Sequence, residues 1–213
     1  MMTAEEFQAL TGASAERMAD LAAFHEHLTE ANAVMNLVGP GSMPDFWNRH
    51  GWDSAQLLEL APDAKTWADL GAGAGFPGVV LAILLKDDPD AHVWLIDSLQ
   101  KRCKFLQYVV DELELPATVI WGRAEEQELE VDIVTARAVA SLDKLVGYAQ
   151  PYLSRGAQAL FLKGEKAEQE LIDARKVWHL DAELSISRSD PRGRIVTVRT
   201  LRRGPQKRTD AYA

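Results

Sequence analysis

The stretch WADLGAGAGFPG, Trp67 to Gly78, places four glycines within eight positions, between two apolar segments. Because glycine costs ordering entropy, such a cluster indicates backbone with positive φ or the close approach of a bulky group. The pattern is typical of a strand, a glycine turn and a helix, which together let a ligand lie against backbone N–H groups at the helix N-terminus. A nucleotide-like ligand is one interpretation, and a tight turn without a ligand is about as common for a single G-x-G.

Strand and helix patterns alternate from residue 66 onward. We expect strands at 66–70, 92–97, 118–121, 132–136 and 158–163 with helices between them, followed by strands at 179–187 and 194–201. Alternation of this kind predicts a parallel sheet that is covered on both faces. No helix pattern separates the last two strands, so they are expected to pair as an antiparallel hairpin. The predicted fold is α/β, with a Rossmann-like, seven-stranded, mostly parallel sheet.

Helix signals flank this region. Thr3 and Glu6 have the spacing of a capping box, and Asp53 is expected to cap the helix DSAQLLEL. Ser98 is expected to cap the helix that follows the second strand, with Cys103 on its apolar face. Cys103 is therefore interpreted as a core residue and not as a nucleophile.

Composition limits the class of protein. A length of 213 residues with 47% hydrophobic and 26% charged residues fits one globular domain with a short extension. A single cysteine excludes an internal disulfide and fits a reducing cytoplasm. No apolar stretch approaches the ~20 residues of a membrane span, so a soluble cytoplasmic protein without membrane contact is expected. Scattered histidines and one cysteine predict no metal site.

The net charge of −9 argues against a nucleic-acid partner, but its distribution weakens that argument. Residues 188–213 contain eight Arg or Lys and two Asp, a local charge of +6 that leaves −15 for the preceding residues. Such asymmetry indicates phosphate contact, and a solvated basic terminus is the alternative. We expect a helical extension at 1–62, a main domain at 63–203 and a basic tail at 204–213.

The glycine turn departs from the dinucleotide-binding pattern. G-x-G-x-x-G would require a third glycine where Phe76 stands, whereas this turn has Gly71, Gly73 and Gly75. Asp97 closes the second strand, where a carboxylate can accept both hydroxyls of a ribose or simply complement the next helix. No basic residue in the turn is available to a phosphate. The pattern therefore favours a ligand with a ribose and no phosphate, and S-adenosylmethionine is such a ligand.

Seven stretches carry a family resemblance. They are NLVG, NRHGWDSAQL, DLGAGAGFPG, DSLQKRCKFL, GRAEE, TARAVASLDKL and LKG, in this order between about residues 36 and 164. Together they resemble the small-subunit ribosomal RNA guanine-N7 methyltransferase family (the RsmG, or GidB, family). The resemblance implies a class I methyltransferase fold, S-adenosylmethionine as cofactor and 16S ribosomal RNA or the small ribosomal subunit as partner. We expect the enzyme to be a monomer.

The resemblance also implies cofactor contacts at matching positions. These are Gly71, Phe76, Ala124, Glu125 and Arg137, and the turn and ribose arguments add Gly73, Gly75 and Asp97. The Ala124 main chain and the Glu125 carboxylate suit the two hydrogen-bonding groups of an adenine edge. An ordinary exposed acidic turn is the alternative for these two residues.

Cations near the strand ends are the expected RNA contacts. The predicted set is Arg49, His50, Arg123, Arg137 and Lys163. Arg137 and Lys163 lie at the ends of predicted strands. A cation there can neutralise RNA phosphates or bind the methionine carboxylate of the cofactor. The alternative is that both are surface cations whose stems lie along apolar surface. His50 is expected either to contact RNA or to cap a helix of the extension, and Asp53 matches the family without an assigned role.

The implied reaction is methyl transfer to guanine N7. This atom carries an in-plane lone pair and no proton, so we expect no general base and name no catalytic residue. One alternative is a methyltransferase that acts on a small molecule. Another is a non-catalytic ribosome assembly factor with a vestigial pocket, against which the intact glycine turn and Asp97 argue.

Overall fold

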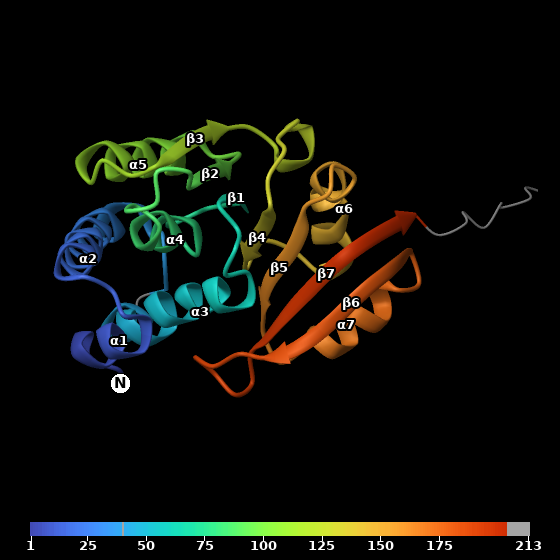
Figure 1. Ribbon diagram of the computed structural model, residues 1–213, viewed down its shortest axis with the longest axis horizontal. Coiled ribbons are helices and arrows are strands. Elements are labelled where there is room, and N and C mark those ends of the chain that lie inside the picture. Colours follow the sequence, from blue (N-terminus) through green and yellow to red (C-terminus); the bar gives the residue numbers. More distant parts are fainter. Residues whose placement is uncertain (40, 204–213) are drawn as a thin grey trace, which may run out of the picture.

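The computed structural model describes residues 1–39 and 41–203 and confirms the predicted α/β fold. Within these residues the strands are β1 (Thr66–Leu70), β2 (His92–Asp97), β3 (Ala117–Trp121), β4 (Ile133–Arg137), β5 (Gln158–Lys163), β6 (Trp178–Ile186) and β7 (Arg194–Arg203). They form one sheet in the order β3-β2-β1-β4-β5-β7-β6 (Figure 1). β1 to β5 pair in parallel, and β7 runs antiparallel to both β5 and β6, as the hairpin prediction requires.

Helices cover both faces of the sheet. They are α1 (Ala4–Thr11), α2 (Ala15–Met35), α3 (Asp53–Leu60), α4 (Gly78–Leu84), α5 (Gln100–Glu112), α6 (Leu142–Leu153) and α7 (Ala167–Ala174), with short helices η1 (Met43–Asp45), η2 (Trp47–Trp52) and η3 (Ala124–Glu126). α4 packs against β1 and β2, α5 packs against β2 and β3, and α2 and α3 pack outside these helices. α6 and α7 pack together beside the terminal strands (Figure 1).

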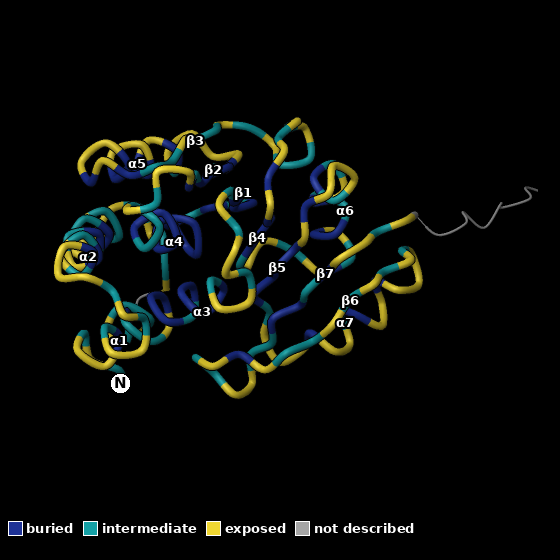
Figure 2. The backbone as a smooth tube through the Cα atoms, viewed as in Figure 1, coloured by how far each residue is buried: buried dark blue, intermediate teal, exposed yellow. Residues whose placement is uncertain are grey.

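Two hydrophobic cores follow from the alternation of side chains along the strands. One joins the first 62 residues to the sheet, because Phe24 and Leu57 pack in the same cluster as Trp67 and Leu95. The other lies between the opposite sheet face and α6. Figure 2 shows the buried segments concentrated in the central strands and α4. The helical extension therefore shares its core with the sheet, and the domain division at residue 62 stays a prediction.

Local signals are confirmed at one helix end and wrong at two others. Thr3 and Glu6 form the predicted capping box of α1. Ser98 does not cap α5: the N-cap is Leu99, whose N–H donates to Asp97 Oδ1 over 2.8 Å. Asp53 is not a cap because η2 runs directly into α3, which places Asp53 inside a continuous helical segment. The Asp97 carboxylate, and not the Ser98 hydroxyl, thus accepts the N–H at the start of α5, and the Asp53 carboxylate does not cap α3.

The strand order places a ligand site on the carboxyl side of β1. β2 and β3 extend the sheet on one side of β1, and β4 and β5 extend it on the other. Ligands of open α/β sheets bind at such a switch point, beyond the carboxyl ends of the strands. The glycine turn leaves β1 at this point. The predicted basic tail, 204–213, lies outside the described residues.

Candidate active site

Positive backbone φ values explain the glycines of the turn. Gly71, Gly73 and Gly75 have φ values of 71°, 58° and 101°, in the region that side chains disfavour. A Cβ on Gly71 would lie 2.8 Å from Val139 Cγ2, and one on Gly75 would lie 2.7 Å from Val79 Cγ2. The turn therefore needs bare backbone for its own path and packing, and the N–H groups of these three glycines are hydrogen-bonded within the chain.

Asp97 ties the end of β2 to this turn. Its side chain is buried, with 3% of the residue exposed, and Oδ2 accepts the N–H of Gly73 over 2.9 Å. Oδ1 accepts the N–H of Leu99, and the Arg102 guanidinium lies 3.6 Å from Oδ2. A carboxylate offers about four lone-pair sites, so each oxygen retains acceptor capacity. Asp97 therefore both holds the turn and suits the hydroxyls of a ribose.

Asp69 is a buried acid beneath the turn that the sequence reasoning missed. Its Oδ2 accepts the Gly78 N–H over 2.8 Å, and a Cβ on Gly78 would lie 2.6 Å from the same oxygen. Among the described residues, Oδ1 has no hydrogen-bond partner. Complete burial raises the pKa of Asp69 to about 7, opposed by the Gly78 hydrogen bond and the Arg137 charge. The signal was available: an acidic residue in the apolar run TWADL.

The loop after β3 carries the predicted adenine contacts. Ala124 and Glu125 lie in η3, and the Ala124 carbonyl accepts the Tyr152 hydroxyl over 2.7 Å. Arg123 Nε donates to Glu125 Oε1 over 2.7 Å, and the Arg123 side chain is 59% exposed. η3 is therefore fixed to α6 through Tyr152. Arg123 is accessible at the surface, although its charge is shared with Glu125.

Arg137, the last residue of β4, lies beside the glycine turn. Its guanidinium stands over the Phe76 ring, with Cζ 4.8 Å from the ring centroid. Nη1 donates to the Arg49 carbonyl over 2.8 Å and to Asp53 Oδ2 over 3.3 Å. Nη2 contacts His50 Nδ1 over 2.9 Å. The structure thus brings together Phe76 and the three residues of the NRHGWDS segment that the sequence singled out.

His50 is buried between Phe76 and Arg137. It is 5% exposed, and its ring stacks on Phe76 with centroids 4.4 Å apart. Burial, followed by the nearby Arg137 charge, lowers the pKa of His50 from 6.5 to about 3. The imidazole is therefore neutral at physiological pH. The capping interpretation of His50 is wrong, because no side chain caps α3.

The turn of the terminal hairpin docks on η2 and α3. Ser189 Oγ donates to Asp53 Oδ1 over 2.6 Å, and the Ser189 carbonyl accepts Asn48 Nδ2 over 3.1 Å. Gln56 makes two further links, donating to Ser187 Oγ over 3.0 Å and accepting the Arg188 N–H over 2.8 Å. No sequence signal connected these segments, which are more than 130 residues apart.

Lys163 and Arg49, two predicted RNA contacts, have contrasting surroundings. Lys163 Nζ donates to the Ala140 carbonyl over 2.8 Å and pairs with Glu170 at 2.7 Å, with 10% of its side chain exposed. Its ammonium group therefore fixes the loop after β4. Arg49 is exposed, and its side chain forms no ion pair with any described residue. Of the two, Arg49 has the freer charge.

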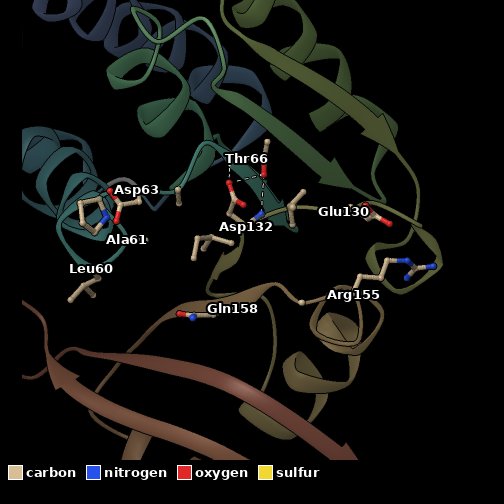
Figure 3. A pocket seen from close by; sticks show the side chains of 13 residues that line it. Leu60, Ala61, Asp63, Thr66, Glu130, Asp132, Arg155 and Gln158 are labelled. Atoms are coloured by element: carbon tan, nitrogen blue, oxygen red, sulfur yellow. Dashed lines mark hydrogen bonds between the residues drawn. The ribbon is translucent and has the colours of Figure 1, made fainter.

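The opposite edge of the sheet holds a separate hollow of about 620 Å³ (Figure 3). It is open and lies at the amino ends of β1, β4 and β5, bounded by Asp63, Glu130, Asp132 and Arg155. Asp132 there accepts both the N–H and the hydroxyl of Thr66 over 2.9 Å. Asp132 and Arg155 hydrogen-bond to nearby backbone groups, and the buried polar side chains described above lie at the other edge of the sheet.

Two features are absent from the described residues. None of their helices combines the length and the apolar composition that a membrane span requires. Nor do three His, Cys, Asp or Glu side chains of this part of the chain gather as a metal-binding group.

Comparison with known proteins agrees with the geometry. Residues 17–192 match the family model described as rRNA small subunit methyltransferase G. The ribosomal RNA small subunit methyltransferase G of Caulobacter vibrioides (strain NA1000 / CB15N) is 55% identical over 95% of this chain and 94% of that protein. The protein of the same name from Caulobacter sp. (strain K31) is 59% identical over 92% of this chain and 89% of that protein.

Solved structures show the same fold at low sequence identity. An O-methyltransferase of Bacillus cereus in complex with SAH is 15% identical, with a TM-score of 0.57 over 84% of this chain and 91% of that one. A SAM-dependent methyltransferase of Aquifex aeolicus is 16% identical, with a TM-score of 0.55 over 73% of this chain and 92% of that one. Both likenesses support the class I methyltransferase fold.

Proposed function

Because the chain belongs to the rRNA small subunit methyltransferase G family, we propose that it transfers the methyl group of S-adenosylmethionine to N7 of a guanine in small-subunit (16S) ribosomal RNA. The observation that carries the cofactor assignment is Asp97, a buried carboxylate with spare acceptor capacity beside a glycine turn without a basic residue. Such a site suits a ribose ligand without phosphate. The proposed enzyme is cytoplasmic and acts as a monomer.

Different residues of the site are proposed to bind three parts of the cofactor. Asp97 is proposed to accept the ribose hydroxyls, and η3, with Ala124 and Glu125, to border the adenine. Arg137 is proposed to hold the methionine carboxylate, because its guanidinium lies against Phe76 of the glycine turn. This placement favours the cofactor over an RNA phosphate as the partner of Arg137, whose side chain is only 19% exposed.

Proximity and water exclusion are the proposed sources of catalysis. S-adenosylmethionine, when bound, supplies an electrophilic methyl group. The protein must hold guanine N7 in line with that group, and orientation of this kind is worth on the order of 7–11 kcal/mol. Since N7 has no proton to lose, no side chain is required as a base. Buried His50, whose pKa is lowered to about 3, is a weak proton acceptor and fits this absence of proton transfer.

RNA recognition is proposed to use exposed cations around the carboxyl edge of the sheet. Arg49 and Arg123 are accessible there, whereas Lys163 is engaged within the chain. Guanine N7 lies on the major-groove edge, which A-form RNA buries in a deep and narrow groove. A loop or a distorted helix is therefore the expected substrate region.

A chemical cleavage experiment tests this assignment. Methylation of N7 leaves a fixed positive charge that weakens the imidazole ring of guanine toward reduction, so borohydride followed by aniline should cut the RNA at the modified base. We expect one cut in small-subunit RNA from cells that carry the gene and none at that position in a deletion strain. The wild-type gene should restore the cut, and Asp97→Ala should not. The same pattern with and without the gene would refute the RNA assignment, and labelled methyl transfer to RNase-treated extract would then point to a small molecule.

A further inference from the structure

Three of the five N–H groups of Arg137 are engaged by one short segment of the chain. Nη1 uses its two on the Arg49 carbonyl and on Asp53, and Nη2 uses one on His50. Arg49, His50 and Asp53 all lie in η2 or at the start of α3. The guanidinium is thus held from one side, and the Nε–H and one Nη2–H, which have no partner among the described residues, can face a ligand.

His50 contributes an acceptor to this arrangement. A guanidinium has only donors, so Nδ1 of His50 must accept and the ring proton must be on Nε2. Nε2 is buried and has no hydrogen-bond partner among the described residues. An unpaired buried donor costs stability, so such a group calls for an explanation other than stability. Orienting Arg137 is a role that explains it.

Asp53 is itself oriented by the terminal hairpin. Its Oδ1 accepts from Ser189 Oγ over 2.6 Å and from Gln56 Nε2 over 3.3 Å, while Oδ2 faces Arg137. Asp53 and Arg137 are both largely buried, with side chains 16% and 19% exposed. The ion pair therefore has little freedom to exchange for solvent, and its geometry is fixed from two directions.

We propose that Asp53 and His50 are positioning residues, which hold the Arg137 guanidinium in the orientation that binds the carboxylate of the cofactor. This inference rests on the proposed function, and specifically on Arg137 as the carboxylate ligand. It gives a role to two residues of the NRHGWDS segment. It also makes the hairpin turn, through Ser189, part of the support of the site.

A pair of ligands isolates this role. Decarboxylated S-adenosylmethionine keeps the adenosine, the sulfonium and the ammonium of the cofactor and lacks only the carboxylate. The ratio of its dissociation constant to that of S-adenosylmethionine, measured by calorimetry on the full chain, therefore reports the carboxylate contact. Because hydrogen bonds to charged groups are strong, we expect the wild type to prefer S-adenosylmethionine by about tenfold or more.

The variants separate positioning from general stability. In Asp53→Asn, which preserves size, we expect the preference to fall several-fold while the affinity for the decarboxylated ligand stays unchanged. His50→Ala should behave in the same way. His50→Asn should keep the preference for S-adenosylmethionine, because the asparagine amide oxygen can replace Nδ1 as the acceptor. Glu59→Gln is the matched control, since Glu59 also joins α3 to the hairpin, through Arg188, without contacting Arg137.

Each outcome separates the inference from the function on which it rests. An unchanged preference in both Asp53→Asn and His50→Ala would overturn the positioning role, as would an equal loss of affinity for both ligands in Asp53→Asn. Equal affinities in the wild type would show that Arg137 does not bind the carboxylate and would overturn the inference, leaving methyl transfer intact. If the wild type bound neither ligand and the RNA cleavage test were negative, the proposed function itself would be refuted.

Discussion

The carboxylate of Asp97 accepts a 2.9 Å hydrogen bond from the backbone N–H of Gly73, which joins the end of β2 to the middle of the glycine turn. The same carboxylate accepts the Leu99 N–H at the start of the next helix. One acidic residue therefore fixes the two loops that border the proposed ribose site. Its removal should affect both the ligand and the turn, and an experiment must distinguish these effects.

Asp97→Ala should weaken S-adenosylhomocysteine binding by roughly 1.5–3 kcal/mol, because the variant lacks the charged acceptor that is proposed to bind the ribose hydroxyls. Calorimetry measures the affinity, and thermal unfolding measures the accompanying change in stability. Asp132→Ala is the control, because Asp132 also accepts backbone N–H groups, from Lys65 and Thr66, but lies at the opposite edge of the sheet. It should lower the melting temperature without changing affinity. Unchanged affinity in Asp97→Ala would remove Asp97 from the cofactor site.

Burial of neutral His50 predicts a pH dependence of stability. Its pKa is about 3 in the folded chain and near 6.5 in the unfolded chain, so between these values the unfolded state binds the extra proton. The free energy of unfolding should therefore rise with pH across this window, and His50 should contribute about 2 kcal/mol of the change from pH 5 to pH 7. Denaturant unfolding of the wild type and His50→Asn at both pH values tests this. The same pH dependence in both proteins would contradict it.

The sequence predicted the sheet because its signals are local. Strand alternation, the glycine turn and the capping box of Thr3 and Glu6 all lie within short windows, and each was confirmed. Cys103 is likewise buried, as its place on an apolar helix face predicted. The class I fold was expected from the same patterns together with the family motifs.

The surroundings of the site were harder to predict because they depend on contacts between distant segments. Nothing in the sequence linked Ser189 to Asp53. The count of charges also took no account of pairing. Four basic residues of the terminal hairpin pair with acids of the described chain, namely Arg188 with Glu59, Arg192 with Asp190, Arg194 with Glu168 and Arg199 with Glu183. The local excess of positive charge therefore overstates the charge that is free to meet RNA.

The methylation rate should be nearly independent of pH, because no base acts on guanine N7. At saturating RNA and cofactor, single-turnover methylation should be flat between about pH 6.5 and 9. Asp69, with a pKa of about 7, titrates in this range and requires a control. Asp69→Asn removes that titration, so any slope that Asp69 causes should disappear in the variant. A tenfold rise per pH unit in both proteins would show that another group must lose a proton, and the N7 assignment would fail.

The C-terminal tail is predicted to contribute to RNA binding through its own cations. β7 continues to Arg203, so a truncation after this residue removes Lys207 and Arg208 and leaves the strand intact. Each cation that neutralises a phosphate releases condensed counterions, and the slope of log affinity against log salt changes by roughly 0.7–0.9 for each such cation. Truncation should therefore reduce the slope by about one to two units and weaken RNA binding at low salt.

The double variant Lys207→Gln and Arg208→Gln, which keeps the length of the chain, should match the truncation if charge is the cause. S-adenosylhomocysteine affinity should be unchanged in both, because neither change alters a residue of the proposed cofactor site. An identical salt slope in wild type and truncation would leave the RNA contacts to exposed cations of the folded domain, of which Arg49 is the first to test.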